Sequence, residues 1–467
     1  MSEYFIENIW TIKSELVYNL NHTFMTESQI EQYALDILTN LGWQVLHGPD
    51  IGPDGAMAER ELRQMVLPER LYNALVRLNP HIPEPALNEA MRRLTQISKP
   101  SLIENNHEFH QLLIAGIPVQ YRAPSGDVKH DIVRVVDFSS PKNNDFAAVN
   151  QLTVLQGDYN RRPDIVLFVN GLPLVVIELK NAADTKADLV AAYQQIQTYK
   201  REISDLFRFN ELCVTSDGIE AEMGTITSPL ERMMPWKTID GEKEVGNVPM
   251  LEALLRGACT PERLLDMVQN FIVFERSDGD KLIKKVAAYH QYWVVNKALD
   301  RTLTASSERG DQRAGVVWHT QGSGKSLSMV FYTGKLMKSR DLHNPTIVVV
   351  TDRNDLDGQL FGTFSACREL LGEDPKQADS RSELRKLLQR QAGGIIFTTI
   401  QKFSPEDDED KLPILTDRRN VIVMADEAHR SQYGLKAHVR ASDAQLVYGY
   451  AKYMRDALPG ASYIGFT

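Results

Sequence analysis

An apolar stretch of the sequence, RRPDIVLFVNGLPLVVIELK, covers residues 161–180 and contains three charged residues after the two arginines at its start. They are Asp164, Glu178 and Lys180. Burying an unpaired charge is costly, so we expect something to compensate these residues, and a bound metal ion would do so. Two carboxylates on one face make an oxygen site suited to Mg²⁺, beside which a lysine could orient or deprotonate a water molecule. The residues predict hydrolysis of a phosphodiester; the alternative is that they only cap strand ends and line an exposed edge.

This chemistry requires a hairpin that brings both carboxylates to one face. Asn170-Gly171 is a strong turn signal, so the strands on either side should pair antiparallel. A plain two-residue loop would pair residues whose numbers sum to 341, and would put Asp164 and Glu178 on opposite faces. We therefore expect a three-residue turn with Gly171 in the left-handed conformation, which makes the sum even. Lys180 then joins the same face, because side chains alternate along a strand.

A second candidate site lies in VVWHTQGSGKSLSMV, residues 316–330. The segment has a strand, a glycine-rich turn and the start of a helix, an arrangement whose backbone N–H groups bind phosphates. Lys325 would reach the β and γ phosphates of a nucleotide, and the Ser326 hydroxyl would ligate Mg²⁺. His319 stands where the strict pattern has glycine. The turn residues expected around the phosphates are Thr320, Gln321, Gly322, Ser323 and Gly324.

Farther along the chain, VIVMADEAH supplies a strand that ends in two carboxylates, Asp426 and Glu427. Nucleotide hydrolysis needs one carboxylate near the Mg²⁺ ion and a second to align the attacking water, and these residues fit those roles in that order. The string DEAH at 426–429 resembles a helicase motif, and this resemblance implies that His429 couples the nucleotide to the DNA side. Alone, the segment could be an acidic loop that starts a helix; together with the glycine-rich turn it indicates an ATP site.

The first part of the chain, residues 1–235, is expected to form a mixed α/β nuclease domain. A helix with Thr26 as its N-cap should begin at Glu27 and stop at Gly42, and another should run roughly over 183–202. A helical insert at about 52–98 should contain helices broken by the proline-rich NPHIPEP.

The later part of the chain has a different texture. Residues 236–261 are turn-rich and are expected to be a linker. In residues 262–467, short apolar runs such as TIVVVT and VIVMA alternate with helix-like stretches, which predicts a doubly wound parallel sheet. The acidic run EDDED, residues 406–410, is expected to be a solvated loop.

Composition limits the possible functions. Of 467 residues, 62 are acidic and 52 basic, and the net charge of −10 argues against general attraction of the whole chain to nucleic acid. Any DNA contact must be local or provided by a partner. Cys213, Cys259 and Cys367 lack the spacing of a zinc module, and no apolar run reaches roughly 18 residues, the length of a membrane helix. We expect a cytoplasmic protein that does not contact a membrane.

The strings PD at 163–164 and ELK at 178–180 together resemble the PD-(D/E)xK nuclease motif in full. Gln195 and Tyr199 lie at positions i and i+4, on one helix face, although by chemistry alone they could be an ordinary polar and aromatic pair. They resemble the Q-x-x-x-Y element that accompanies this motif in the R subunits of type I restriction enzymes. The resemblance implies that Glu31 is the additional acidic residue seen in related nucleases.

The string HTQGSGKS resembles motif I of superfamily-two helicases, which relax the first glycine. VTDRNDLDGQL looks like motif Ia and TTIQKF like motif Ib, and this likeness implies that Arg353, Thr399 and Gln401 contact DNA. YHQYWVV resembles the adenine-contacting segment, with Gln291 as its best candidate. The other polar and aromatic residues of that segment could equally be packing residues.

The resemblance to type I R subunits covers nearly the whole chain. It implies a restriction-endonuclease-like mixed-sheet domain followed by a RecA-like P-loop domain, with Mg²⁺ and ATP as cofactors. The implied function is an ATP-dependent DNA translocase and endonuclease of a bacterial or archaeal restriction system. The implied partners are double-stranded DNA and the methyltransferase (M) and specificity (S) subunits.

The sequence stops at YIGFT, where motif III of the family would continue. The second motor domain and its arginine finger follow that point in the family, so we expect this chain to bind ATP without translocating. Two other interpretations remain open. One is a free-standing repair helicase with a fused nuclease, which would act without partners; the other is a catalytically silent DNA- or ATP-binding fragment.

Overall fold

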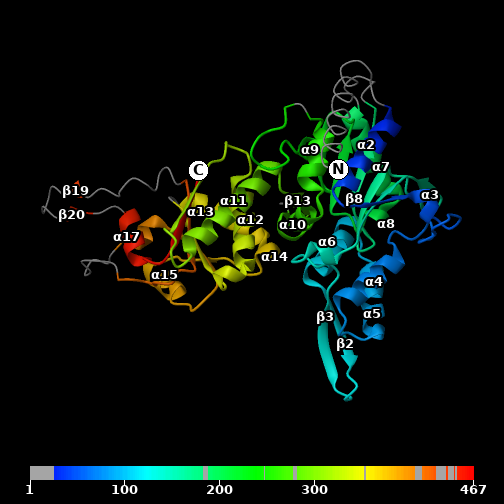
Figure 1. Ribbon diagram of the computed structural model, residues 1–467. Helices are drawn as coiled ribbons and strands as arrows, with labels where there is room; N and C mark the ends of the chain where they lie inside the picture. The colour runs from blue at the N-terminus through cyan, green and yellow to red at the C-terminus, as the bar shows by residue number, and fades with distance from the viewer. Residues whose placement is uncertain are drawn as a thin grey trace, which may run out of the picture. The chain divides into compact units, whose positions relative to one another are not determined.

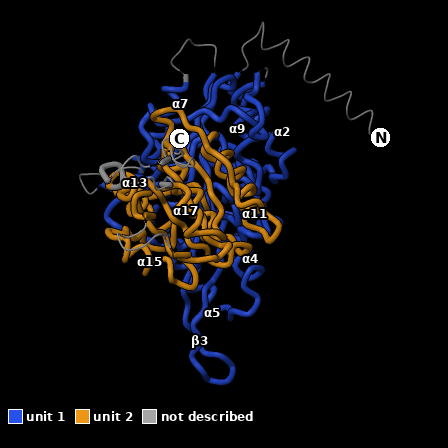
Figure 2. The backbone as a smooth tube through the Cα atoms, turned by 90° about the vertical axis from the view of Figure 1, so that its left-hand side faces the viewer, with its two compact units in different colours: residues 1–269, 277–289 blue, residues 270–276, 290–467 orange. Residues whose placement is uncertain are grey.

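The computed structural model describes residues 26–181, 188–246, 248–276, 281–351, 354–404, 413–427, 438–439, 446–447 and 450–467. The chain divides into two compact units, coloured separately in Figure 2. Unit 1 takes in the described residues up to 269 together with 281–289; unit 2 takes in 270–276 and the described residues from 290 onward. The segment 236–261, expected as a linker, lies within unit 1. The domain bounds drawn from the sequence stay a prediction.

Unit 1 is built on a seven-stranded mixed sheet (Figure 1). In pairing order its strands are β1 (Gln44–His47), β4 (Phe146–Asn150), β7 (Ile165–Val169), β8 (Leu172–Leu179), β9 (Leu212–Ser216), β10 (Ala221–Gly224) and β11 (Met234–Pro235). The β1–β4 and β8–β9 pairs are parallel, and the other neighbours are antiparallel. Every residue of β7 and β8 is buried, which explains why this hairpin is so apolar.

Helix α2 (Glu27–Asn40) begins and ends where the sequence predicts. The Thr26 side chain accepts a hydrogen bond from the Gln29 N–H, and the Gln29 side chain accepts one from the Thr26 N–H, which completes a capping box. Gly42 follows the helix with a φ of 93°. The buried side of α2 packs against β1, β4, β8 and helix α9 (Met250–Ala258).

The remaining helices that begin in unit 1 are α3 (Gly48–Ile51), α4 (Pro68–Leu78), α5 (Glu84–Thr95), α6 (Leu102–Ala115), α7 (Asp188–Glu202), α8 (Ser204–Phe207) and α10 (Pro261–Asn270). Two small antiparallel ribbons accompany them, β2 (Ile117–Arg122) with β3 (Val128–Val133) and β5 (Val154–Gln156) with β6 (Tyr159–Arg161). Single turns of 3₁₀ helix form η1 (Pro141–Asn143) and η2 (Leu230–Arg232). Helix α7 packs on β8 and β9, and so borders the polar end of the central hairpin.

Strand β13 (Leu282–Val286) is held to unit 1 by a buried ion pair. Lys284 Nζ lies 2.6 Å from Glu211 Oε2, and both side chains have no exposed surface. Lys284 Nζ also donates to Asn106 Oδ1 at 3.0 Å and to the Asn210 carbonyl at 2.9 Å. These additional acceptors matter, because a buried ion pair is tolerated only when its remaining hydrogen-bonding groups are satisfied.

Unit 2 contains a six-stranded sheet in which every neighbouring pair is parallel. In pairing order its strands are β14 (Arg313–Val317), β21 (Ser462–Phe466), β18 (Val421–Asp426), β15 (Thr346–Thr351), β17 (Ile395–Thr399) and β16 (Lys376–Gln377). The predicted fold class, a mixed-sheet nuclease-like domain followed by a parallel P-loop sheet, is therefore confirmed. The glycine-rich turn follows β14 and the acidic pair ends β18, so both lie at the carboxyl edge where α/β sheets bind ligands.

The helices of unit 2 are α11 (Tyr289–Ser306), α12 (Lys325–Lys338), α13 (Asn354–Ala366), α14 (Arg368–Leu371), α15 (Arg381–Leu388) and α17 (Tyr450–Ala457), with 3₁₀ turns η3 (Arg340–Leu342) and η4 (Ile400–Phe403). Three further short strands are β12 (Ile272–Arg276), β19 (His438–Val439) and β20 (Leu446–Val447). One hydrophobic core joins two of these helices to the sheet. It contains Leu384 and Leu388 of α15, Met454 of α17, and strand residues such as Val348 and Val423. The acidic run 406–410 lies outside the described residues.

Candidate nuclease and nucleotide sites

The β7–β8 hairpin brings Asp164 and Glu178 to the same face, as the sequence predicts. Ile165 pairs with Ile177, so the next step along the ladder sets Asp164 opposite Glu178. The Leu179 N–H donates to Asp164 Oδ2 at 2.7 Å, which fixes the aspartate against the neighbouring strand.

The three-residue turn predicted to produce this register is wrong. Val169 pairs directly with Leu172, so the loop contains only Asn170 and Gly171. Their φ angles are 49° and 77°, both left-handed, as in a type I′ turn. The buried Asn170 side chain, which donates to the Val135 carbonyl at 2.9 Å, holds the turn in this form.

A β-bulge in β8 restores the even register instead. Leu167 pairs with Val175, whereas the next residue, Phe168, pairs with Pro173, so Leu174 is the extra residue. The physical reason is that proline has no N–H to donate to the ladder, and prolines inside sheets therefore sit at bulges or edges. The bulge shifts the register by one residue, and this shift brings the two carboxylates together.

Burial dominates the electrostatics of the carboxylate pair. Asp164 is 6% exposed and Glu178 2% exposed. Burial raises the pKa of Asp164 to about 6. Burial and the neighbouring Asp164 charge raise the pKa of Glu178 to about 8. Among the described residues, the buried Glu178 Oε2 atom has no hydrogen-bond partner. Burial therefore disfavours the ionised form of the pair, a cost that the protein compensates only in part.

Lys180 supplies that partial compensation. Its Nζ lies 2.9 Å from Glu178 Oε1 and 2.8 Å from the Leu179 carbonyl. Burial disfavours its charge, but the Glu178 carboxylate outweighs burial and raises the pKa of Lys180 above its ordinary value. Lys180 is therefore protonated at neutral pH, and one ammonium group faces two carboxylates.

Helix α2 adds further acidic residues beside this group. Asn150 donates to Glu31 Oε1 at 2.6 Å, and the Gln151 amide donates to the other oxygen of Glu31. Glu27 Oε2 lies 3.8 Å from Lys180 Nζ. The charges of Glu27 and Glu31 also contribute to the raised pKa of Asp164. The predicted accessory residue Glu31 thus lies near the carboxylate pair; its role stays a prediction.

The predicted pair on α7 also reaches the site. Tyr199 is buried, and its hydroxyl donates to the Arg162 carbonyl at 3.4 Å. Burial and then the Glu178 carboxylate raise the pKa of Tyr199, while a hydrogen bond with Gln195 opposes the shift. Gln195 and Tyr199 therefore lie on the helix face that borders the carboxylates.

The residues present fit a small hard cation. Among the described residues no group of three His, Cys, Asp or Glu side chains could hold a metal. The two carboxyl groups that share one face here are those of Asp164 and Glu178. Mg²⁺ commonly binds through one or two carboxylates and keeps several waters. The unpartnered Glu178 oxygen and the raised pKa values of both carboxyl groups are the features that such an ion would satisfy.

In unit 2, the glycine-rich turn adopts a conformation that requires glycine. Gly322 and Gly324 have φ angles of 81° and 86°, in the left-handed region. Gly324 is the N-cap of α12, and a Cβ atom there would lie 2.7 Å from Gln291 Nε2. Lys325 and Ser326 follow in the first turn of α12, so the backbone N–H groups at this helix start are available to an anion.

Lys325 connects the turn to the acidic pair. Its Nζ lies 2.7 Å from Asp426 Oδ1 and also contacts Glu427 Oε1. Burial lowers the pKa of Lys325, but the hydrogen bonds that Lys325 donates to both carboxylates outweigh burial and raise it. Three residues from motifs that lie far apart in the sequence therefore meet at one point.

The other predicted nucleotide and DNA residues have mixed outcomes. Gln291 is buried and donates to the Gly324 carbonyl at 3.0 Å, so it contacts the glycine-rich turn. Thr399 ends β17 with a buried side chain, and Gln401 in η4 is exposed. Arg353 and His429 lie outside the described residues. Contacts of these residues with DNA or adenine stay predictions.

Comparison with known proteins identifies relatives of this chain. It is 47% identical over 449 residues to the type I restriction enzyme HindI endonuclease subunit of Haemophilus influenzae, a match that covers 95% of this chain and 42% of that protein. This chain is a homologue of type I restriction enzyme endonuclease subunits.

Other comparisons agree with this relationship. Residues 24–232 of this chain match the family of the type I restriction enzyme R protein N terminus. Residues 290–467 of this chain match the SWI2/SNF2 ATPase family. A putative type I restriction enzyme endonuclease subunit of Methanocaldococcus jannaschii, MjaIXP, is 32% identical over 94% of the chain and 42% of its own length. A second one, MjaVIIIP, is 25% identical over 86% of the chain. The chain spans 42% of the length of the first two relatives.

One contact in this chain was not predicted from its sequence. Glu27 contacts Lys180, although the two residues lie far apart in the sequence. The available signal was its position four residues before Glu31, which places both carboxylates on one face of α2. Among the described residues, no helix combines the length and apolar character needed to cross a bilayer.

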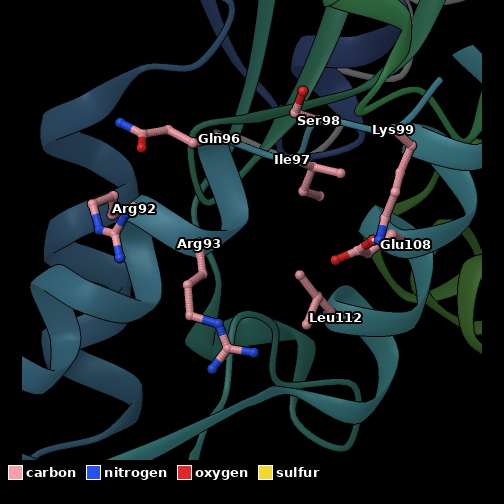
Figure 3. A pocket seen from close by; sticks show the side chains of 8 residues that line it. All are labelled: Arg92, Arg93, Gln96, Ile97, Ser98, Lys99, Glu108 and Leu112. Atoms are coloured by element: carbon pink, nitrogen blue, oxygen red, sulfur yellow. The ribbon is translucent and has the colours of Figure 1, made fainter. Parts of the chain in front are cut away.

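A pocket of about 300 Å³ lies apart from both sites, beside α5 and α6. Figure 3 shows its lining side chains, among them Arg92, Arg93 and Lys99. Lys99 is paired with Glu108 at 2.5 Å, and Arg92 is paired with Glu89 at 2.8 Å. None of the site residues predicted for this chain lines this pocket.

Proposed function

We propose that this chain carries the DNA-cleaving site and an ATP site of a type I restriction enzyme endonuclease subunit. The observation that carries the proposal is the placement of Asp164, Glu178 and Lys180 together at the buried end of one hairpin. The relatives named as endonuclease subunits support the same activity class.

In the cleavage reaction, Asp164 and Glu178 would hold a Mg²⁺ ion. When bound, the ion would supply an activated water and neutralise charge that develops on the phosphate. Lys180 is protonated at neutral pH. It therefore serves as a hydrogen-bond donor that orients water or a phosphate oxygen, rather than as the base that deprotonates the water. Gln195, Tyr199 and Glu31 would position the carboxylates and the DNA strand.

In the ATP site, the backbone of residues 320–326 would surround the phosphates. Lys325 would exchange its contacts with the two carboxylates for the β and γ phosphates. Asp426 and Ser326 would then ligate Mg²⁺, and Glu427 would align the attacking water. Arg353, Thr399, Gln401 and His429 remain the proposed link between this site and DNA.

This chain spans 42% of the length of the first two relatives. We propose that ATP hydrolysis drives DNA translocation in the cytoplasm, and that methyltransferase and specificity subunits select the DNA site. The net charge of −10 supports delegated recognition, because a strongly acidic chain gains little from nonspecific attraction to DNA.

Cleavage of covalently closed plasmid by the assembled restriction complex, with Mg²⁺ and ATP, tests the nuclease assignment. The Asp164→Asn substitution should abolish nicking, because it removes one of the two carboxylate charges that hold the metal. The matched control is Glu61→Gln, an exposed acidic residue of unit 1 outside the site. Full nicking by the Asp164 variant would refute the assignment. Activity of the chain without partner subunits would favour the free-standing repair nuclease instead.

A further inference from the structure

The glycine-rich turn is held by two histidines that the sequence motif does not explain. His290, in the first turn of α11, has its Nε2 atom 3.0 Å from the Ser323 carbonyl. His319, which replaces the first glycine of the strict motif, has its Nδ1 atom 3.0 Å from Ser323 Oγ. Both rings therefore contact the same residue of the turn.

The hydrogen-bonding partners fix which ring atoms carry protons. A carbonyl can only accept, so His290 must donate from Nε2. The Ser323 hydroxyl donates to the Thr320 carbonyl at 2.8 Å, which uses its only proton, so His319 must donate to Ser323 Oγ from Nδ1. This arrangement leaves His319 Nε2 as an acceptor, and that buried atom has no partner among the described residues. Burial, then His290 and Lys325, lower the pKa of His319, which keeps the ring neutral in this tautomer.

The His290 contact also orients a backbone donor. In a planar trans peptide, the C=O of one residue and the N–H of the next point in opposite directions. The Ser323 carbonyl points to His290, so the Gly324 N–H points away from it. The adjacent Gly324 carbonyl is occupied by Gln291 at 3.0 Å and by the Ser328 N–H at 3.1 Å. The carbonyls of Ser323 and Gly324 are thus both engaged by residues of α11 and α12.

We propose that His290 and His319 are positioning residues that, through Ser323, hold the phosphate-binding turn in the conformation described above. In this conformation the amide N–H groups of the turn meet the phosphates of ATP without rearrangement. The inference rests on the proposed ATP site and adds the residues that preorganise it. It also gives His319 a role at the position where the strict motif has glycine.

The two tautomers allow a crossed test with variants of matched size. The glutamine amide nitrogen stands where imidazole Nε2 stands, and the asparagine amide nitrogen stands where Nδ1 stands. His290→Gln and His319→Asn should therefore bind ATP within about twofold of the unaltered chain. His290→Asn and His319→Gln should bind about fivefold more weakly, as expected for one lost hydrogen bond. Titration of the full chain with a fluorescent ATP analogue and Mg²⁺ measures this, and thermal unfolding of each variant shows that it folds.

Inorganic tripolyphosphate, used as a competitor, separates this role from adenine contact. Its affinity should fall by the same factor as that of ATP in the two weakened variants, because the lost interaction lies at the phosphates. Unchanged tripolyphosphate affinity, or equal behaviour of Asn and Gln at each position, would overturn the proposal. If the unaltered chain does not bind ATP, the proposed ATP site fails as well; if it binds and all four variants bind equally, only the present inference fails.

Discussion

The two sites use the same three side-chain types, Asp, Glu and Lys, in different arrangements. In unit 1, Glu178 keeps one oxygen without a partner, and burial raises the pKa values of Asp164 and Glu178 to about 6 and about 8. In unit 2, one lysine contacts both Asp426 and Glu427. The difference follows from the backbone. Lys180 directly follows the strand that carries Glu178, whereas Lys325 starts a helix and contacts both carboxylates at a strand end. The first arrangement favours a cation, and the second holds a lysine that phosphates can attract.

The largest expected effect is on metal affinity after Glu178→Gln. The substitution removes the more buried of the two proposed metal ligands, so Mn²⁺ affinity measured by calorimetry should fall by more than about 100-fold, since even the loss of an outer-shell partner costs 10- to about 100-fold. ATP affinity should not change, because unit 2 has its own carboxylates. A variant that still binds Mn²⁺ tightly would remove the proposed difference between the sites.

The converse substitution is Lys325→Ala. It removes the cation that would reach the phosphates, so ATP affinity should fall on the order of 100-fold, as for a lost hydrogen bond between charged groups. Metal affinity at the nuclease site should stay the same. Fluorescence titration with an ATP analogue measures the first quantity and calorimetry with Mn²⁺ the second; a parallel loss of both would show that the sites are not independent.

In the absence of metal, the stability of unit 1 should depend on pH through Asp164 and Glu178. Folding raises the pKa values of Asp164 and Glu178, so the folded chain holds their protons more tightly than the unfolded chain. Their contribution is fully present below the ordinary carboxyl pKa and is lost as pH rises toward about 8. The free energy of unfolding of unit 1 should therefore fall by a few kcal/mol from about pH 4 to about pH 8.

Urea unfolding at about pH 5, 7 and 9 measures this slope. Glu178→Gln should flatten most of it, because its amide does not titrate. Saturating Mg²⁺ should also flatten it, by favouring the ionised carboxylates. A metal-free chain whose stability rises over the same interval would contradict the assigned charge balance.

The smallest expected effect concerns the turn that sets up the nuclease site. Gly171→Ala would place a Cβ atom 2.5 Å from the Leu67 carbonyl at a φ of 77°, so it should lower the free energy of unfolding by about 1–3 kcal/mol. Gly126→Ala is the matched control, because Gly126 has a φ of 91° but nothing within 4 Å of the added atom. Urea unfolding compares the two, and equal losses would show that only backbone strain matters.

The sequence predicted what depends on local pattern and missed what depends on distant contacts. The strands of the parallel sheet are short apolar runs, and the two runs named from the sequence, TIVVVT and VIVMA, form β15 and most of β18. The shared face of Asp164 and Glu178 was predicted, but through a turn that does not form, because a proline-linked bulge and a three-residue turn have the same effect on register. Helix α6 was not predicted, although its capping box at Ser101 and Glu104 is a local signal. The contact of Glu27 with Lys180 needs the packing of α2 on the sheet, which no local pattern contains.

The bulge at Leu174 imposes a parity rule on the length of the β7–β8 hairpin. If one residue is removed or added between Asp164 and Glu178, the side chains of one strand turn to the opposite face of the sheet and the two carboxylates are separated. If two residues are removed or added, both carboxylates stay on the same face. Homologous hairpins that keep the site should therefore differ in length by even numbers, or should lose the bulge together with the proline that accompanies it.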